Sequence, residues 1–247
     1  MSCVAIITAR GGSKRIPRKN IKNFCGKPII AYSIEACLKS GVFEEVMVST
    51  DDKEIAEISV QYGASVPFFR SAENSDDYKN STDAIIEVIE EYRKLGREFD
   101  SLAMIYPTAP FITAEKLKNG MKAFTESGAD SLIPVVSFGY PPQRGYVIKD
   151  GKLEFLHPEY KFTRSQDLEP MYHDVGQFYF AKTEPFMRFK TVITENIATI
   201  VLPEEEVQDI DNESDWKLAE IKYKQFVAEP EKILSPQDLL YGLYTNK

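Results

Sequence analysis

Short apolar runs alternate with stretches of helical hydrophobic spacing through the first half of the chain. Residues 3–8 (CVAIIT) are apolar on both faces, which is typical of a strand inside a parallel sheet. Further strands are expected at 45–50, 64–69, 101–106 and 131–138, with helices at 28–41, around 55–62, at 82–95 and at 113–127. Repeated strand–helix units predict a mainly parallel sheet with helices on both faces, a three-layer Rossmann-like α/β fold. Ligands of such sheets bind beyond the carboxyl ends of the strands.

The pattern changes after Phe138. Lys149, Asp150 and Gly151 lie between alternating apolar residues, and an Asp-Gly turn in that setting predicts a β-hairpin. Strands at about 177–181 and 197–202 and a helix at about 213–227 are expected to follow. A chain of 247 residues can bury a sizeable core as one α/β domain, so we expect residues 1–247 to form a single domain.

Charge and composition exclude several classes of protein. The net charge is −8, which makes the chain a poor general binder of nucleic acid or of anionic membranes. No apolar run approaches the roughly 20 residues of a membrane span, and no signal peptide is recognised. Three cysteines without CxxC spacing indicate reduced thiols in a cytoplasmic protein. With two histidines in the chain, a histidine-rich zinc site is not expected.

The loop after the first strand concentrates positive charge in this acidic chain. Between positions 9 and 20 it has no acidic residue, and its cations are Arg10, Lys14, Arg15, Arg18 and Lys19. Gly11 and Gly12 allow backbone N–H groups to approach an anion, so the loop suits a triphosphate and a leaving pyrophosphate. It matches neither the Walker A nor the GxGxxG pattern, which disfavours a P-loop or nicotinamide enzyme. The alternative is a solvated basic loop, in which the clustered cations would repel one another.

A second motif, Gln208-Asp-Ile-Asp-Asn-Glu-Ser-Asp215, precedes the last expected helix. Asp209 and Asp211 are two residues apart, so both carboxylates face the same side of an extended segment. Such a pair of hard oxygen ligands is how proteins hold Mg²⁺ beside substrate phosphates. Helix capping by Asp211 or Asn212 is the alternative.

Two further polar stretches are candidates for ligand contact. Residues 106–110 (YPTAP) form a stiff loop that can place backbone groups against a base or a sugar. Residues 163–179 contain Arg164, Gln166 and His173, which can hold a carboxylate and hydroxyl groups. The alternative for this second stretch is an ordinary surface loop.

The pattern Ala9-Arg10-x-x-Ser13-Lys14-x-x-Pro17-x-Lys19-Asn20, with Tyr106-Pro-Thr-Ala-Pro-Phe111, resembles the CMP-sugar synthetases. This cytidylyltransferase family includes the sialic acid and Kdo enzymes, and the resemblance covers about residues 3–226. It implies a nucleotidyltransferase fold, a Mg²⁺ cofactor and a homodimer. In that dimer a protruding hairpin insertion, here about 139–175, reaches into the active site of the partner.

The resemblance also implies roles for individual residues. Its nucleotide-binding positions are Ala9, Arg10, Gly11, Ser13, Lys14, Lys19, Asn20, Arg70, Ser81 and Thr108. Its metal ligands are Asp209 and Asp211, and Arg10, Lys19 and Asp211 carry the catalytic roles.

Two departures bear on the sugar. Tyr106 stands where the sialic acid enzymes usually have Gln, and Val175-Gly176 stands where they have Asn-Gly. Residues 163–168 and 172–174 are instead similar to the pseudaminic acid cytidylyltransferases. We therefore expect CTP and pseudaminic acid to give CMP-pseudaminic acid and pyrophosphate, for bacterial surface or flagellin glycosylation. The residues expected on the sugar side are Tyr106, Arg164, Gln166 and His173.

Other functions remain open at this point. Sialic, legionaminic and Kdo sugars are alternative substrates. A nucleotidyltransferase acting on UTP or GTP with a sugar phosphate usually has Gly-x-Gly-x-Arg chemistry that this chain lacks. A non-catalytic nucleotide-binding module is disfavoured by the aspartate pair, because carboxylates repel an anion unless a metal lies between them.

Overall fold

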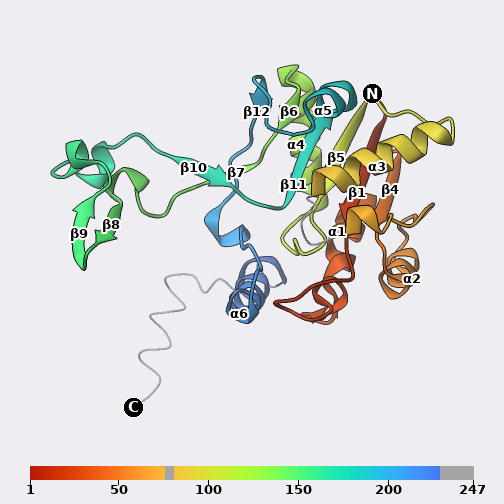
Figure 1. Ribbon diagram of the computed structural model, residues 1–247, viewed down its shortest axis with the longest axis horizontal. Coiled ribbons are helices and arrows are strands. Elements are labelled where there is room, and N and C mark those ends of the chain that lie inside the picture. Colours follow the sequence, from red (N-terminus) through yellow and green to blue (C-terminus); the bar gives the residue numbers. More distant parts are fainter. Residues whose placement is uncertain (76–80, 229–247) are drawn as a thin grey trace, which may run out of the picture.

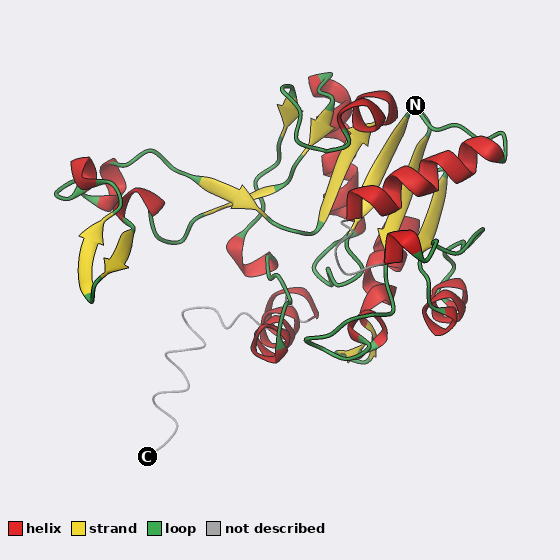
Figure 2. Ribbon diagram, viewed as in Figure 1, coloured by secondary structure: helices red, strands yellow, loops and turns green. Residues whose placement is uncertain are grey.

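The computed structural model describes residues 1–75 and 81–228, and at its centre lies a six-stranded sheet (Figures 1 and 2). The strand order is β12–β6–β11–β5–β1–β4. The bounds are β1 Cys3–Thr8, β4 Glu45–Ser49, β5 Ser101–Ile105, β6 Ser131–Leu132, β11 Phe178–Lys182 and β12 Ile197–Ala198. β1 pairs parallel with β4 and β5, and β6 with β12, whereas β11 runs antiparallel to both β5 and β6. The predicted mainly parallel sheet is confirmed.

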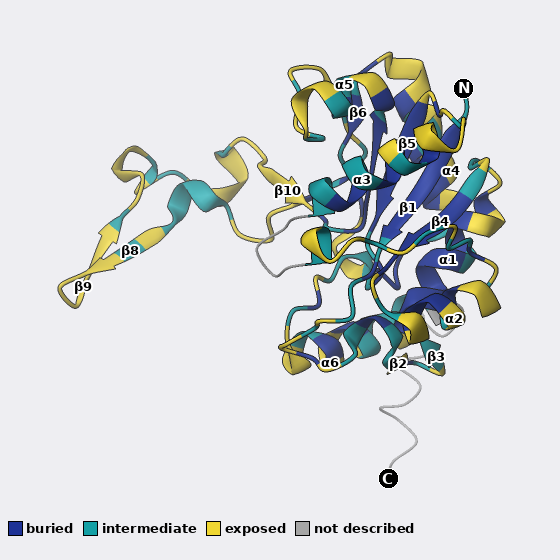
Figure 3. Ribbon diagram, turned by 45° about the vertical axis from the view of Figure 1, so that its right-hand side comes forward, coloured by how far each residue is buried: buried dark blue, intermediate teal, exposed yellow. Residues whose placement is uncertain are grey.

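Helices cover both faces of the sheet, because residues 3–7 of β1 are apolar and successive side chains alternate between the faces. Ala5 and Ile7 pack with α1 (Ile29–Ser40), α2 (Lys53–Gln61) and α4 (Ala114–Ser127). Val4 and Ile6 pack with α3 (Ser81–Lys94) and α5 (Thr183–Phe189). Figure 3 shows the strands as a buried layer between the helices, so the three-layer fold is also confirmed.

Helix ends follow the local sequence. Gly41 ends α1 in the left-handed conformation, with φ 64°. Asp52 and Thr113 cap α2 and α4, because each side chain accepts a backbone N–H from the first turn. The last helix, α6, runs from Glu213 to Lys222 and continues as a π-helical turn over Tyr223–Ala228. The rest of the predicted domain, after residue 228, lies outside the described residues.

Proline explains where the expected strands are shortened. No strand forms at 64–69 in the described chain, where Ser65 makes an isolated bridge to Met47 and Pro67 has no N–H to donate. That expectation was wrong. The expected strand 131–138 is divided at Pro134 into β6 and β7 (Val135–Ser137). The expected strand 197–202 is reduced to β12, although Val201 still bridges Val135 before Pro203.

An arm projects from the sheet, and the chain enters and leaves it through a two-stranded stem (Figure 1). The stem pairs β7 with β10 (Tyr172–Asp174). At the far end, β8 (Tyr146–Lys149) and β9 (Lys152–Phe155) form the predicted hairpin. Its Asp150 and Gly151 both have positive φ, 49° and 74°, as a primed two-residue turn requires. A smaller hairpin, β2 (Asn23–Phe24) with β3 (Lys27–Pro28), precedes α1.

No helix in residues 1–75 or 81–228 is both long enough and apolar enough to cross a membrane.

Candidate active site

Two neighbouring cavities lie at the edge of the sheet where β1 and β5 end. The first, of about 450 Å³, is lined by Thr8, Arg10, Ser13, Lys14, Arg15, Ile16, Lys19, Asn20, Ser81, Tyr106, Pro107, Thr108 and Asp211. The second, of about 510 Å³, is lined on several sides by polar residues that include His173, Asp174, Tyr179, Gln208, Asp209 and Lys222. Tyr106 lines both cavities, so its side chain lies at the boundary between them.

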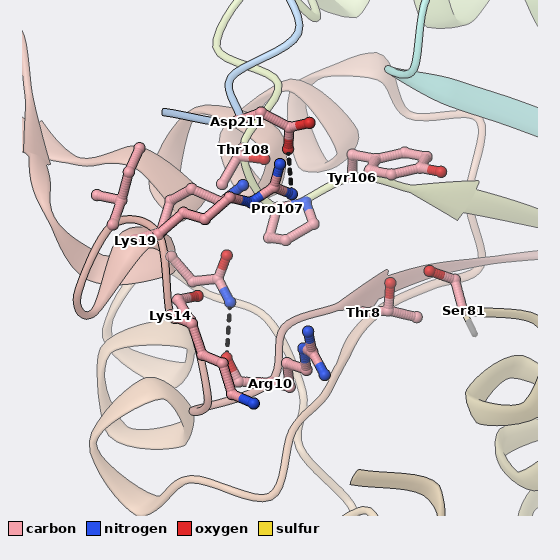
Figure 4. A pocket seen from close by; sticks show the side chains of 13 residues that line it. Thr8, Arg10, Lys14, Lys19, Ser81, Tyr106, Pro107, Thr108 and Asp211 are labelled. Atoms are coloured by element: carbon pink, nitrogen blue, oxygen red, sulfur yellow. Dashed lines mark hydrogen bonds and ion pairs between the residues drawn. The ribbon is translucent and has the colours of Figure 1, made fainter. Parts of the chain in front are cut away.

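The basic loop wraps the first cavity. Asn20 is buried, and its side-chain amide donates a 2.9 Å hydrogen bond to the carbonyl oxygen of Arg10, which closes the loop on itself. Figure 4 shows this bond and the side chains of Arg10, Lys14 and Lys19 around the same space. With Arg15, four cations of the loop line this cavity, and in a chain of net charge −8 they form a local site for an anion.

Arg18, another cation of the loop, pairs with carboxylates at the start of α2. The guanidinium of Arg18 forms two hydrogen bonds with the carboxylate of Asp52 and pairs also with Glu54. Arg18 is not part of the lining of the first cavity as the described residues define it. The hydrogen bonds from Arg18 lower the pKa of Asp52 to about 2. The pair therefore fixes the loop against the start of α2.

Gly11 has a steric reason to be glycine. Its backbone N–H donates to Asp51 at 2.9 Å, and a Cβ atom at this position would come within 2.8 Å of Oδ2 of Asp52. Because Asp51 already accepts this N–H, the glycine serves the close approach of the loop to Asp51 and Asp52.

The aspartate segment has a buried residue between its two carboxylates. Ile210 is fully buried in a cluster with Ile16 and Trp216, so the flanking Asp209 and Asp211 point the other way. Asp211 lines the first cavity and Asp209 lines the second. The segment therefore stands, like Tyr106, between the two cavities.

Contacts on both sides hold this segment in place. Lys19 donates a 2.7 Å hydrogen bond to the carbonyl oxygen of Ile210, and Arg15 forms a 2.7 Å ion pair with Asp211. Asn212 caps α6 in a capping box with Asp215. Of the two residues considered as helix caps, Asn212 and not Asp211 is therefore the N-cap of α6.

The charges of the segment suit a divalent cation. Partial desolvation raises the pKa of Asp209, and the like charge of Asp211 raises it further. Desolvation lowers the pKa of Lys19, while both carboxylates oppose that shift. No cluster of three or more His, Cys, Asp or Glu side chains exists among the described residues. Asp211 faces the basic first cavity and Asp209 faces the adjoining one, and two carboxylates beside a site for phosphates are the donor set that Mg²⁺ takes together with substrate phosphates, so the residues fit this ion.

The second cavity is lined by both polar and aliphatic residues. The hydroxyl of Tyr179 and the backbone N–H of Gly176 both donate to Oδ1 of Asp174 at 2.6 Å. The ring of Tyr179 lies against that of Tyr106, with centroids 6.0 Å apart. Val175 is 3% exposed and packs with Val136 and Leu202. This cavity therefore offers fixed hydrogen-bonding groups beside an aliphatic wall.

The structure brings most of the predicted site residues together. Seven of the nucleotide positions line the first cavity: Arg10, Ser13, Lys14, Lys19, Asn20, Ser81 and Thr108. Ala9 is buried behind it, and Arg70 donates to the backbone and hydroxyl oxygens of Ser49. Of the sugar-side positions, Tyr106 and His173 line the second cavity.

Arg164 and Gln166 lie elsewhere, in the arm. Arg164 is exposed and paired with Asp167, and Gln166 lines a separate hollow near Pro141. Asp174, Tyr179 and Thr8 line the cavities without having been predicted as site residues. Thr8 could have been found as the last residue of the first strand, whereas the Asp174–Tyr179 pair becomes visible once β10 and β11 are placed.

Comparison with known proteins decides the family. A sequence profile described as Cytidylyltransferase matches residues 4–202. The chain belongs to the cytidylyltransferase family.

Relatives of known activity span most of this cytidylyltransferase. It is 40% identical over 225 residues to a pseudaminic acid cytidylyltransferase of Campylobacter jejuni, covering 91% of this chain and 97% of the relative. It is 34% identical over 227 residues to a CMP-N,N'-diacetyllegionaminic acid synthase of Legionella pneumophila, covering 89% and 95%. The solved structure of a CMP:2-keto-3-deoxy-manno-octonic acid synthetase complexed with CTP matches the fold with a TM-score of 0.69 at 16% identity, covering 92% of this chain and 100% of that one.

Proposed function

We propose that this cytidylyltransferase converts CTP and pseudaminic acid to CMP-pseudaminic acid and pyrophosphate. The observation that carries the proposal is the place of Asp209 and Asp211, one on each of two adjoining cavities that share Tyr106. The first cavity has the cations for a triphosphate, and the second has hydrogen-bonding groups for a sugar. The 40% identity to a pseudaminic acid cytidylyltransferase supports the choice of sugar.

The reaction requires the sugar hydroxyl to meet the α-phosphorus at the boundary between the cavities. The anomeric hydroxyl oxygen forms a bond to that phosphorus and loses its proton to solvent, as the bond between the phosphorus and the α,β-bridging oxygen breaks and pyrophosphate leaves with that oxygen. Arg10, Lys14 and Lys19 hold the triphosphate and neutralise the charge that develops on the leaving group. Asp209 and Asp211 would hold Mg²⁺, which when bound supplies further neutralisation and lowers the pKa of the attacking hydroxyl.

The second cavity needs positive charge from outside one chain. Its described lining carries three carboxylates, Asp174, Glu204 and Asp209, against one lysine, Lys222. Lys222 already donates to the carbonyl oxygens of Glu204 and Val207. A nonulosonic acid is an anion, so a further cation must come from another source. Arg164 on the arm of a second copy would meet that need, and we propose a homodimer on this ground.

The surface of the arm supports the same assembly. Several large apolar side chains are exposed on it: Tyr140 (91%), Ile148 (75%), Leu153 (64%) and Phe162 (90%). Large exposed apolar side chains gathered on one projecting segment are typical of protein interfaces. Such an enzyme would work in the cytoplasm, where CTP is made.

The test of the activity is direct. Purified protein with CTP and Mg²⁺ is offered pseudaminic, legionaminic, N-acetylneuraminic and Kdo acids separately, and the products are identified by mass spectrometry. The expected result is CMP-pseudaminic acid and pyrophosphate. Products from UTP or GTP, or no CMP-sugar from any acid, would contradict the proposal.

A further inference from the structure

An ion pair links a buried lysine of α4 to a partly exposed glutamate of the turn before the aspartate segment. Lys116, in the first turn of α4, is 9% exposed, and its ammonium group lies 2.6 Å from a carboxylate oxygen of Glu206. The same ammonium donates a 2.8 Å hydrogen bond to the carbonyl oxygen of Phe111. Neither side chain of the pair belongs to the lining of the two cavities as the described residues give it. The pair therefore cannot touch substrate in this arrangement.

Stability alone does not account for a lysine at this position. Other residues that α4 turns inward are Leu117, Gly120 and Phe124, so an apolar side chain would suit the site. Burial lowers the pKa of Lys116, and the contact with Glu206 opposes the shift. Lys116 is the desolvated partner and Glu206 is partly exposed, and replacing a desolvated ion pair by apolar residues of similar volume is often neutral or stabilising. The pair must then be explained by the geometry that it imposes.

The pair joins two segments that belong to different sides of the site. Phe111 ends the loop that starts at Tyr106, and Glu206 ends the 3₁₀ turn Glu204–Glu206, three residues before Asp209. Gln177 provides a second link between the same two segments. The side-chain amide of Gln177 donates to the backbone carbonyl oxygen of Glu206 at 2.8 Å. The backbone carbonyl oxygen of Gln177 accepts the N–H of Tyr106 at 2.9 Å.

We propose that Lys116 and Glu206 are positioning residues for the metal. They set the distance between the Tyr106–Phe111 loop and the aspartate segment, so that Asp209 and Asp211 meet one divalent cation together with the triphosphate. The inference rests on the proposed function, and it assigns a role in metal binding to two residues that do not line either cavity. Contacts behind metal ligands commonly change metal affinity by about 10–100-fold.

The experiment measures metal binding rather than turnover. Mn²⁺ serves as the probe, titrated by electron paramagnetic resonance into wild-type protein and into Lys116→Met/Glu206→Leu, each with saturating CTP and no sugar. We expect the Mn²⁺ dissociation constant of the double variant to rise about tenfold. Its melting temperature should be unchanged or higher, and its CTP affinity without metal should match that of the wild type.

Two further variants keep the test decisive. Glu206→Gln keeps the shape and a hydrogen bond to Lys116, so it should weaken Mn²⁺ binding less than the double variant does. If the double variant does not fold, Glu206→Gln is measured in its place. Glu45→Gln is the matched control, because Glu45 accepts from Tyr92 and pairs with Arg97 at the opposite end of the sheet. It should lower the melting temperature and leave Mn²⁺ binding unchanged.

The outcomes separate the two proposals. Wild-type Mn²⁺ affinity in a folded Lys116→Met/Glu206→Leu protein, or in Glu206→Gln where the double variant does not fold, would overturn the positioning role and leave the proposed function intact. Absence of Mn²⁺ binding to the wild type with CTP would instead overturn the metal role in the proposed function itself.

Discussion

Arg15 and Asp211 form an ion pair across the mouth of the first cavity, with 2.7 Å between Nη2 and Oδ1 (Figure 4). Their side chains are 67% and 44% exposed, and an exposed pair contributes at most about 1 kcal/mol. A divalent cation that arrives with the triphosphate can therefore take Asp211 from Arg15 at little cost. The guanidinium, which lines the first cavity, would then lie beside the phosphates of the proposed nucleotide.

Asp211→Asn and Asn212→Ala separate metal binding from helix capping. Asp211→Asn keeps the shape and removes one ligand charge, so we expect the rate to fall by about 10²-fold or more with an unchanged melting temperature. Asn212→Ala removes the cap of α6 and should cost about 1 kcal/mol of stability with a much smaller loss of rate. Steady-state kinetics and thermal melts measure both. A normal rate in Asp211→Asn would refute the metal assignment.

Arg10→Ala should weaken CTP binding by about tenfold or more, because it removes a cation that faces the triphosphate. Isothermal titration with CTP measures the affinity, and circular dichroism checks the fold. Arg93→Ala is the control, since Arg93 pairs with Glu184 and lines a different cavity. Equal CTP affinity in folded Arg10→Ala protein would show that the loop does not hold the nucleotide.

Asp52→Asn tests the ion pair that fixes the basic loop. The substitution keeps a side chain able to cap α2, and it removes the charge that faces Arg18. The pKa of Asp52 is lowered to about 2 in the folded protein, so its stabilisation is complete well above about pH 4 and is lost as the pH falls through about 2. Urea unfolding should show the variant about 1 kcal/mol less stable at pH 7, with a smaller difference at pH 3. A difference that does not change with pH would assign the effect to another cause.

The arm should control assembly. Ile148→Asp/Leu153→Asp places two charges on exposed apolar positions of the β8–β9 hairpin, far from both cavities. We expect the wild type to sediment as a dimer and this variant to shift toward monomer and lose turnover, while its melting curve stays cooperative. Lys152→Asp, in the same hairpin, is the matched control for added negative charge. A wild type that sediments as a monomer at micromolar concentration would contradict a shared site.

Local patterns explain what the sequence could predict. The strand 3–8 follows from its apolar run, and the basic loop and the alternation of Asp209, Ile210 and Asp211 are each recognised from a few adjacent residues. The strand expected at 64–69 does not form. The apolar composition of this segment favoured a strand, but Pro67 cannot donate to a ladder.

Long-range pairing explains what the sequence could not predict. The loop's five cations look alike in sequence, yet Arg18 pairs with Asp52 and Arg15 with Asp211, which are 34 and 196 positions away. The same holds for Lys116 and Glu206, because each residue alone reads as a charge on a solvated surface. Such partners are set by the topology of the sheet, which brings distant loops to one edge.

The last prediction concerns the sugar. Nonulosonic acids share a carboxylate and a keto carbon, so discrimination must come from groups that face the ring substituents and the tail. Here Tyr106 lines the second cavity and Val175 belongs to its aliphatic wall, where the sialic acid enzymes have amides. A polar group of the sugar left unpaired by such a wall costs about 1–3 kcal/mol. Two such losses would exclude a sialic acid by a factor of about 10² to 10⁴.

A competition assay with equal pseudaminic and N-acetylneuraminic acids measures this preference. We expect CMP-pseudaminic acid to dominate by at least about a hundredfold, because the methyl group at the far end of pseudaminic acid suits an aliphatic wall. Tyr106→Gln should move the ratio toward the sialic acid by about tenfold, since it restores one amide. Val175→Asn is a poorer test, because Val175 is 3% exposed and an amide there would be buried among Val136 and Leu202. Comparable rates for both sugars in the wild type would show that these two side chains do not select the substrate.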